Sequence, residues 1–159
     1  MTVLDVVKDL DALTLTMTAE FDAPVERVWQ VWADPRLLER WWGPPTHPAT
    51  FVEHELSPGS RVTYFMTGPD GTTYHGWWDV EEVVENTRIT FRDGFADASG
   101  SPDLTLPVST SEITFEPRDG GTRMVLVGRY TERAAFDQVL EMGMQEGMTQ
   151  AVSQIDALL

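Results

Sequence analysis

The sequence contains no cysteine among its 159 residues, only one lysine (Lys8), and no long apolar run. Without cysteine, disulfide bonds, thiolate metal sites, iron–sulfur clusters and cysteine nucleophiles are all excluded. No segment approaches the roughly 18 consecutive apolar residues of a transmembrane helix, and residues 1–8 lack the basic and apolar regions of a secretory signal. We therefore expect a cytoplasmic protein with no membrane partner.

Basic residues are scarce as well, since 11 Lys and Arg stand against 26 Asp and Glu, for a net charge of −15. Nucleic acids and anionic membranes bind basic surfaces, so neither is an expected partner. Most of the acidic residues are interpreted as a solvated surface that favours solubility. The length and the 42% content of hydrophobic residues predict one domain, residues 1–159, with enough chain to bury a core.

The N-terminal part changes its hydrophobic period once. Alternating apolar and polar residues predict a first strand over residues 13–21, because alternate side chains of a strand share a face. Pro24 suits the first turn of a helix, and the valines and tryptophans after it recur at three- and four-residue spacing. Asp34-Pro35 ends this short helix, and a second helical turn is predicted before Gly43-Pro44-Pro45.

The segment from residue 50 to residue 130 is typical of strands separated by tight turns, which implies antiparallel neighbours. The stretch 94–107 has the composition of a long loop, a kind of segment that is often functional or mobile. The expected strands are residues 50–56, 61–67, 73–84, 87–93, 109–116 and 122–130.

Helical spacing of apolar residues returns at the end of the chain and predicts one helix over residues 132–158. At about 1.5 Å per residue, this helix would be roughly 40 Å long. Gly143 and Gly147 lie in its interior, where each costs about 1 kcal/mol relative to alanine. The close approach of another backbone or of a bound molecule would compensate for this cost.

Together these elements predict an α+β fold in which an antiparallel sheet of six to seven strands curls around the C-terminal helix. Many inward positions carry aromatic rings or methionine, whose flexible chain adapts to irregular partners. Such packing can leave an apolar cavity of ligand size, and a completely filled core is the alternative. The inward residues expected from alternation are Val62, Tyr64, Met66, Tyr74, Trp78, Val80, Ile89, Phe91, Ile113, Phe115, Met124, Leu126 and Tyr130, facing Met144, Met148, Val152 and Ile155 of the helix.

Five segments stand out together: residues 21–29, residues 34–44 with the adjacent Trp41 and Trp42, the turns 57–61 and 66–71, and residues 143–148. They resemble the activator-of-Hsp90-ATPase-homologue (AHSA1-like) branch of the START, Bet v 1 and polyketide-cyclase-like superfamily. The resemblance extends from about Leu13 to Leu159 and implies a helix-grip fold, in which the sheet holds the last helix over a cavity. The sequence departs from the pattern at Met144, where relatives commonly have tryptophan.

Histidine provides the main candidate for acid–base chemistry. If Val52 and Leu56 point inward, His54 does too and can donate a hydrogen bond or relay a proton in the cavity. The alternative is a histidine bonded to neighbouring backbone. Glu53 and Glu55 then face the opposite side, so these three residues cannot converge on a metal. No catalytic or nucleotide-binding motif is complete, and no cofactor is expected.

We therefore expect a non-enzymatic binder of a small hydrophobic or amphipathic molecule, with residues 94–107 as a gate and with one residue of the Trp41-Trp42 pair in the core and the other at the rim. One alternative is a cyclase or dehydratase that uses His54 and a tyrosine on a polyketide-like substrate. Another is an interaction module, although an Hsp90-type chaperone is not an expected partner. A homodimer through an exposed strand edge stays open. The expected ligand-binding residues are Trp42, His54, Tyr64, Met66, Tyr74, Trp78, Phe91, Phe95, Met124, Met144 and Met148.

Overall fold

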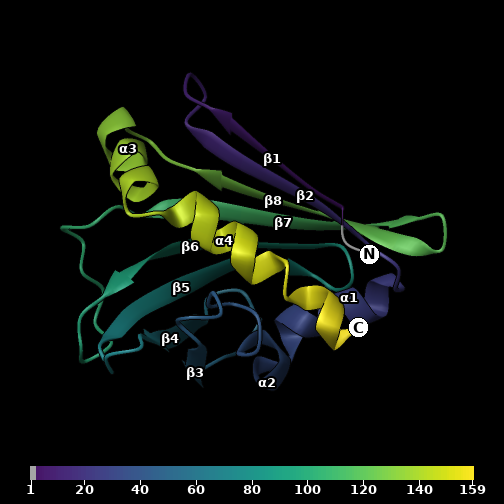
Figure 1. Ribbon diagram of the computed structural model, residues 1–159, viewed down its shortest axis with the longest axis horizontal. Coiled ribbons are helices and arrows are strands. Elements are labelled where there is room, and N and C mark those ends of the chain that lie inside the picture. Colours follow the sequence, from purple (N-terminus) through teal and green to yellow (C-terminus); the bar gives the residue numbers. More distant parts are fainter. Residues whose placement is uncertain (1–2) are drawn as a thin grey trace.

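The computed structural model describes residues 3–159, which form one curved antiparallel sheet with helical segments on its concave side (Figure 1). Within these residues the sheet has eight strands in the order β1-β2-β8-β7-β6-β5-β4-β3. Strands β3 to β8 follow one another as hairpins, and β2 pairs with β8. The strands are β1 (Val3–Asp9), β2 (Thr14–Phe21), β3 (Ala49–Glu53), β4 (Arg61–Thr67), β5 (Thr73–Val84), β6 (Arg88–Ala96), β7 (Ser109–Arg118) and β8 (Gly121–Arg129).

The α+β class is confirmed and the arrangement agrees with a helix-grip fold, but the expected number of six to seven strands is wrong. The additional strand is β1, which pairs only with β2 at one edge of the sheet. Its sequence lacks a clean alternation, because Val6 and Val7 are adjacent and Val7 is exposed. An edge strand of this kind is stabilised by its backbone pairing, which hydrophobic periodicity does not reveal.

Two short helices connect β2 to β3, as the change of period predicted: α1 (Val25–Ala33) and α2 (Pro35–Leu38). Asp34 separates them, and its side chain accepts a hydrogen bond from the Arg36 amide at 2.9 Å. The apolar stripe of α1 is buried against the concave face of the sheet. This brings the tryptophans of α1 and of the segment after α2 into one cluster.

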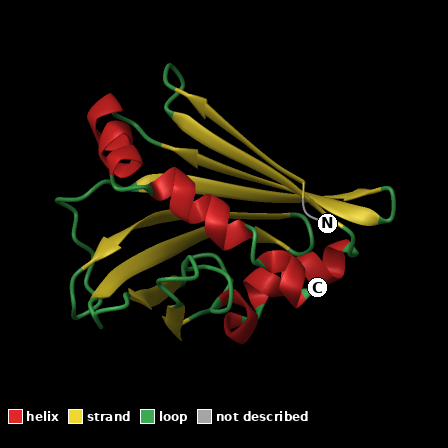
Figure 2. Cartoon of the chain, in the orientation of Figure 1, coloured by secondary structure: helices red, strands yellow, loops and turns green. Residues whose placement is uncertain are grey.

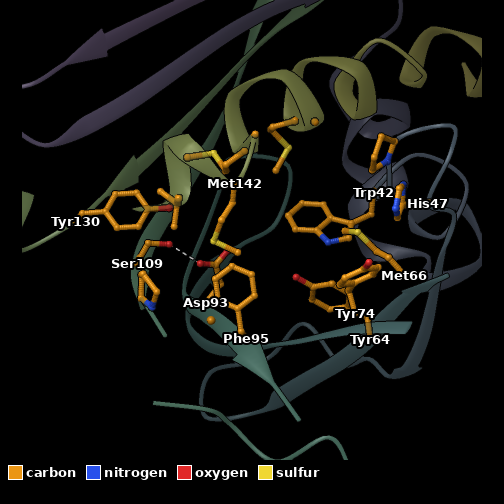
Figure 3. Close-up of a pocket in the computed structure, with 18 residues that line it drawn as sticks. Trp42, His47, Tyr64, Met66, Tyr74, Asp93, Phe95, Ser109, Tyr130 and Met142 are labelled. Atoms are coloured by element: carbon orange, nitrogen blue, oxygen red, sulfur yellow. Dashed lines mark hydrogen bonds between the residues drawn. The ribbon is translucent and has the colours of Figure 1, made fainter. Parts of the chain in front are cut away.

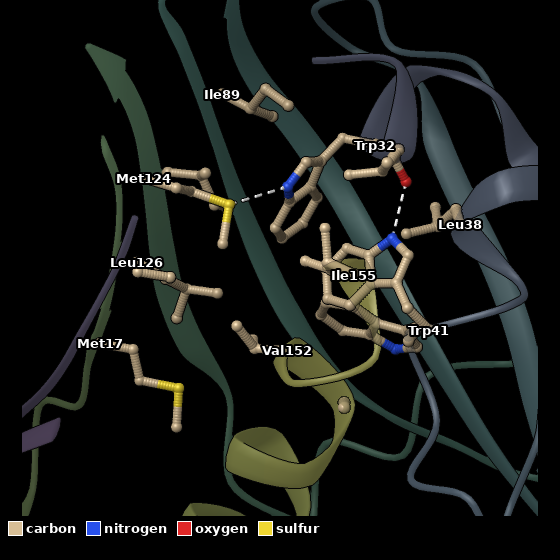
Figure 4. Packing of buried hydrophobic residues seen from close by; sticks show 14 of the residues in the cluster. Met17, Trp32, Leu38, Trp41, Ile89, Met124, Leu126, Val152 and Ile155 are labelled. Atoms are coloured by element: carbon tan, nitrogen blue, oxygen red, sulfur yellow. Dashed lines mark hydrogen bonds between the residues drawn. The ribbon is translucent and has the colours of Figure 1, made fainter. Parts of the chain in front are cut away.

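Tryptophan contacts dominate this part of the core (Figure 4). The Trp32 and Trp41 rings lie edge to face with centroids 4.8 Å apart. Both indole nitrogens have partners, since Trp32 Nε1 donates to the Met124 sulfur at 3.3 Å and Trp41 Nε1 donates to the Val31 carbonyl at 2.8 Å. Edge-to-face pairs contribute about 0.5–1.5 kcal/mol beyond the burial of their area.

The expected continuous helix over residues 132–158 is wrong. The segment consists of α3 (Arg133–Glu141), α4 (Met144–Val152) and a final 3-10 turn, Ile155–Leu158. Gly143 has a φ of 84° and begins α4 in the left-handed region, so the chain changes direction there. In Figures 1 and 2, α4 lies across the concave face of the sheet while α3 stands at one end of it.

The predicted strand boundaries are accurate for β4 and β5 and less so elsewhere. β6 extends to Ala96, which forms an isolated bridge with Pro102, so the long loop begins later than residue 94. β3 ends at Glu53 instead of residue 56, and its register against β4 shifts between Phe51 and Glu53. Within residues 3–159, no helix has the length and apolar character needed to cross a bilayer.

We expect opposite effects of alanine at the two glycines of the C-terminal segment. Gly143→Ala should lower the free energy of unfolding by about 1–2 kcal/mol, because an L residue is strained at positive φ. Gly147 lies inside α4, and a Cβ there would meet nothing within 4 Å. Gly147→Ala should therefore raise the free energy of unfolding by up to about 1 kcal/mol. Urea denaturation of both variants measures these values, and a change of the same sign in both would contradict the assigned break.

Candidate functional site

A cavity of about 590 Å³ lies between the sheet and the helices α3 and α4 (Figure 3). It adjoins the tryptophan cluster, because Trp42 packs against Trp32 with ring centroids 5.7 Å apart and also lines the cavity. Exposed side chains such as Tyr74 and Met142 mark where the cavity meets solvent. This volume falls within the usual range for small-molecule sites, roughly 300–1,000 Å³. The lining residues are Trp42, Pro44, His47, Tyr64, Met66, Tyr74, Asp93, Gly94, Phe95, Pro107, Ser109, Tyr130, Val139, Met142, Gly143, Met144, Gly147 and Met148.

The same strands supply both the core and the cavity wall. On β6, Ile89 and Phe91 are fully buried, whereas Asp93 and Phe95 line the cavity two and four residues further on. All four share one face because side chains alternate along a strand. The inner face of the sheet is therefore filled at one end and open at the other.

Helix α4 contributes methionines and glycines to the opposite wall. Met144, Gly147 and Met148 are spaced by three and four residues, which places them on one side of the helix. Gly143 and Gly147 both line the cavity, and neither would bring a Cβ within 4 Å of other atoms. Close approach of another backbone therefore does not explain Gly147, and the space beside it is open.

A polar cluster lies in this mostly apolar wall. Asp93 on β6 and Ser109 on β7 are cross-strand partners, and the Ser109 hydroxyl donates a hydrogen bond to Asp93 Oδ1. Burial raises the pKa of the Asp93 carboxyl to about 6, and the Ser109 hydrogen bond opposes this rise. The pKa of Tyr130 is also raised, first by burial and then by the negative charge of Asp93.

Tyr64 brings a further hydroxyl group to the cavity lining. Its ring lies over Gly76 of β5, where a Cβ would come within 2.4 Å of the Tyr64 ring and hydroxyl. Burial raises the pKa of Tyr64, with a further contribution from the charge of Asp93. The buried indole nitrogens of Trp42 and Trp78 make no hydrogen bond of normal geometry, although both lie close enough to the Tyr64 hydroxyl to oppose the rise in its pKa.

The structure divides the eleven expected ligand-binding residues into three groups. The first group lines the cavity: Trp42, Tyr64, Met66, Tyr74, Phe95, Met144 and Met148. Trp78, Phe91 and Met124 do not line it, because they are fully buried in the core, where Trp78 stacks on Phe91 with centroids 4.3 Å apart. Of the tryptophan pair, Trp41 lies wholly in the core and Trp42 faces the cavity.

His54 forms the third group and requires a correction. The expectation that it points into the cavity together with Val52 is wrong, since Val52 is 65% exposed and His54 Nε2 lies 3.0 Å from the Trp32 carbonyl oxygen. The expectation assigned the wrong face of the strand, because Ala49 and Phe51 are the buried residues of β3 and the alternate residue Val52 is therefore exposed. Desolvation by burial lowers the pKa of His54, which favours the neutral ring.

Asp93 and Ser109 are among the lining residues that the sequence did not predict, together with residues such as His47 and Met142. A signal for the two polar residues exists in the sequence, because Asp93 has the same parity as Ile89 and Phe91, and Ser109 has the same parity as Ile113. No group of three or more His, Asp or Glu side chains within residues 3–159 could hold a metal ion.

Similar proteins were found among solved structures but not among curated proteins. A search of curated proteins found no match to the chain. Among solved structures, a protein from Mycobacterium smegmatis is 57% identical with a TM-score of 0.91, and the match covers 99% of this chain and 97% of that one.

Two further structures extend the comparison. A protein from Arthrobacter aurescens is 47% identical over 97% of this chain and 90% of its own, with a TM-score of 0.93. A protein from Nitrosomonas europaea is 25% identical over 93% of this chain and 94% of its own, with a TM-score of 0.80. The family model described as activator of Hsp90 ATPase homolog 1-like protein matches residues 22–159, so the chain belongs to this AHSA1-like family.

Proposed function

We propose that this protein binds a small amphipathic molecule in the cavity between the sheet and helix α4. One observation carries the proposal: a cavity of about 590 Å³ with a mostly apolar wall contains a single carboxyl group, that of Asp93, hydrogen-bonded to Ser109. Apolar walls with a few convergent polar groups are typical of ligand sites. The AHSA1-like family membership supports the same reading at the level of the fold.

The composition of α4 also favours an occupant. Glycine inside a helix costs about 1 kcal/mol relative to alanine, and nothing in the protein contacts the side-chain position of Gly147. Met144 and Met148 are unbranched and can adjust to guests of different shape. Packing within the protein therefore does not explain the glycine at position 147. A ligand beside α4 would use the space that Gly147 leaves and the flexible side chains of Met144 and Met148.

Binding would be driven by removing apolar surface from water, at about 25 cal/mol per Å². Loss of the ligand's freedom offsets part of this gain. The hydroxyls of Tyr64 and Tyr130 and the Asp93 carboxyl would orient the polar end of the ligand. The segment between β6 and β7 remains a candidate gate, since Phe95 near the end of β6 and Pro107 shortly before β7 both line the cavity.

The cyclase or dehydratase alternative loses its acid–base residue. That mechanism requires His54 inside the cavity, and the structure places the His54 ring against the Trp32 carbonyl instead. We therefore propose binding.

We expect Gly147→Leu to block the cavity. A leucine side chain at this position of α4 would fill part of the open space, and the affinity for the neutral apolar fluorophore N-phenylnaphthylamine should fall by at least about tenfold. Fluorescence titration measures the change. Gly147→Ala is the matched control, because one methyl group leaves most of the space free. Equal binding by wild type and Gly147→Leu, or no binding of the fluorophore by wild type, would contradict the proposed function.

We also expect Asp93 to make stability depend on pH. Because the folded-state pKa of about 6 lies above the ordinary 3.8, the folded protein keeps a proton that the unfolded chain releases within this window. The contribution of Asp93 to the free energy of unfolding should therefore be most favourable below about pH 4. It should fall by less than about 3 kcal/mol as the pH rises to about 6. Asp93→Asn should remove this fall and be more stable than wild type near neutral pH.

Urea unfolding of wild type and Asp93→Asn across this pH range measures the difference. The asparagine can still accept the Ser109 hydrogen bond, so the comparison isolates the charge. An Asp93→Asn variant that is less stable than wild type near neutral pH would show that the carboxylate stabilises the empty protein, and would weaken its assignment to ligand binding.

A further inference from the structure

We propose that the cavity selects amphiphiles whose polar end is a protonated amine, with the ammonium group held at Asp93 and Ser109 and the apolar part against the methionines of α4. This inference rests on the proposed function, since it requires that the cavity binds a ligand. It adds the chemical class of the polar end, which neither the cavity volume nor the family assigns.

The first argument is that the Asp93 carboxylate has no cationic partner. Its hydrogen bond comes from the neutral Ser109 hydroxyl, and in the described part of the chain no ion pair includes Asp93. Arg92, the adjacent basic residue on β6, has the opposite parity and lies over the Trp77 ring, 5.9 Å from its centroid. A carboxylate removed from bulk water is stable only when it is paired or hydrogen-bonded, so the position is suited to a cation supplied by the ligand.

The second argument concerns the groups around the carboxylate. The Ser109 hydroxyl uses its hydrogen for Asp93 and therefore offers only lone pairs to a ligand. Tyr130 provides another hydroxyl in the same lining. In Figure 3, Ser109 and Tyr130 lie on one side of Asp93 and the Phe95 ring lies on the other. An ammonium group has several donors and no acceptor, which matches this set of acceptors.

The aromatic wall suits the same charge. Trp42, Tyr64 and Phe95 line the cavity with Asp93, and the faces of aromatic rings attract cations. In the described lining, the segment of α3 and α4 contributes only apolar residues and glycine. His47, from the loop before β3, is the one side chain of this lining that can become cationic. No lysine or arginine of the lining competes for Asp93.

The whole protein adds a long-range preference. Its net charge of −15 attracts cations and repels anions as they approach the cavity. A fatty carboxylate would bring a second negative charge to Asp93, and a neutral alcohol would leave the buried charge uncompensated. The amine is the class that compensates it.

Three probes with the same alkyl chain test the inference: octylamine, octanol and octanoate, titrated against the protein by calorimetry. Near pH 8, octylamine should bind at least about tenfold more tightly than octanol, with octanoate the weakest, because charge-assisted hydrogen bonds contribute this much. In Asp93→Asn, octylamine and octanol should bind within about twofold of each other. Asp5→Asn, which removes one exposed acid from β1, should keep the wild-type preference.

The pH dependence of wild type provides a second measurement that needs no variant. Alkylamines stay protonated from about pH 8 to about pH 5, whereas Asp93 becomes neutral below its pKa of about 6, so octylamine should weaken by about tenfold and octanol should not. The groups facing Asp93 are Ser109 on β7, Tyr130 after β8 and Tyr64 on β4, and the raised pKa values keep both tyrosines neutral throughout. His47→Gln tests the other titratable side chain of the lining, and loss of the pH dependence in this variant would show that Asp93 is not its source.

The outcomes separate this inference from the function on which it rests. If octanol binds and octylamine is no tighter, or if Asp93→Asn keeps the preference for the amine, the amine assignment is wrong and the cavity remains a binding site. If neither the three probes nor N-phenylnaphthylamine binds, both the assignment and the proposed function are wrong. A preference for octanoate would assign the site to acids instead.

Discussion

The packing of tryptophans between the sheet and the helices at one end of the concave face is the constraint on which the rest of the structure depends. Trp32 and Trp41 satisfy both of their indole nitrogens within the protein, so these large side chains are buried without a polar penalty. They contact one another and fill the space below α1. This end of the concave face is therefore filled by the protein's own side chains.

The same cluster positions the C-terminal segment. Val152 and Ile155 are fully buried in it, and Gln154 Nε2 donates to the carbonyl oxygens of Trp41 and Gly43 at 3.3 and 2.8 Å. Because the end of α4 is anchored here, its beginning extends over the opposite end of the sheet, where only methionines and glycines face the strands. The cavity follows from a helix held firmly at one end and sparsely packed at the other.

The partly buried carboxyl of Asp93 gives this cavity a chemical character that apolar packing alone would not. Asp93 continues the inward register of β6, so the strand that supplies Phe91 to the core also supplies a titratable group to the cavity. The pKa of Asp93 is near 6 and close to physiological pH, so the protonation of the site responds to small changes in its occupant. Strong perturbation of a carboxyl in a cavity is more often a property of functional sites than of structural ones.

By itself, the sequence determined the α+β class, most of the sheet and its inward face, because alternation and turn residues act locally along the chain. The alternation also predicts that Asp93 shares the inward face of β6 with Ile89 and Phe91. Only the tertiary structure decided three features. The break at Gly143 depends on where α3 and α4 must lie relative to the sheet. The inward face of β3 depends on whether Phe51 or Val52 packs against the core, and Phe51 does. The boundary between core and cavity depends on which tryptophans the core buries, since Trp41 lies in the core and Trp42 lines the cavity. Each is set by contacts between segments distant in the chain, which no local pattern contains.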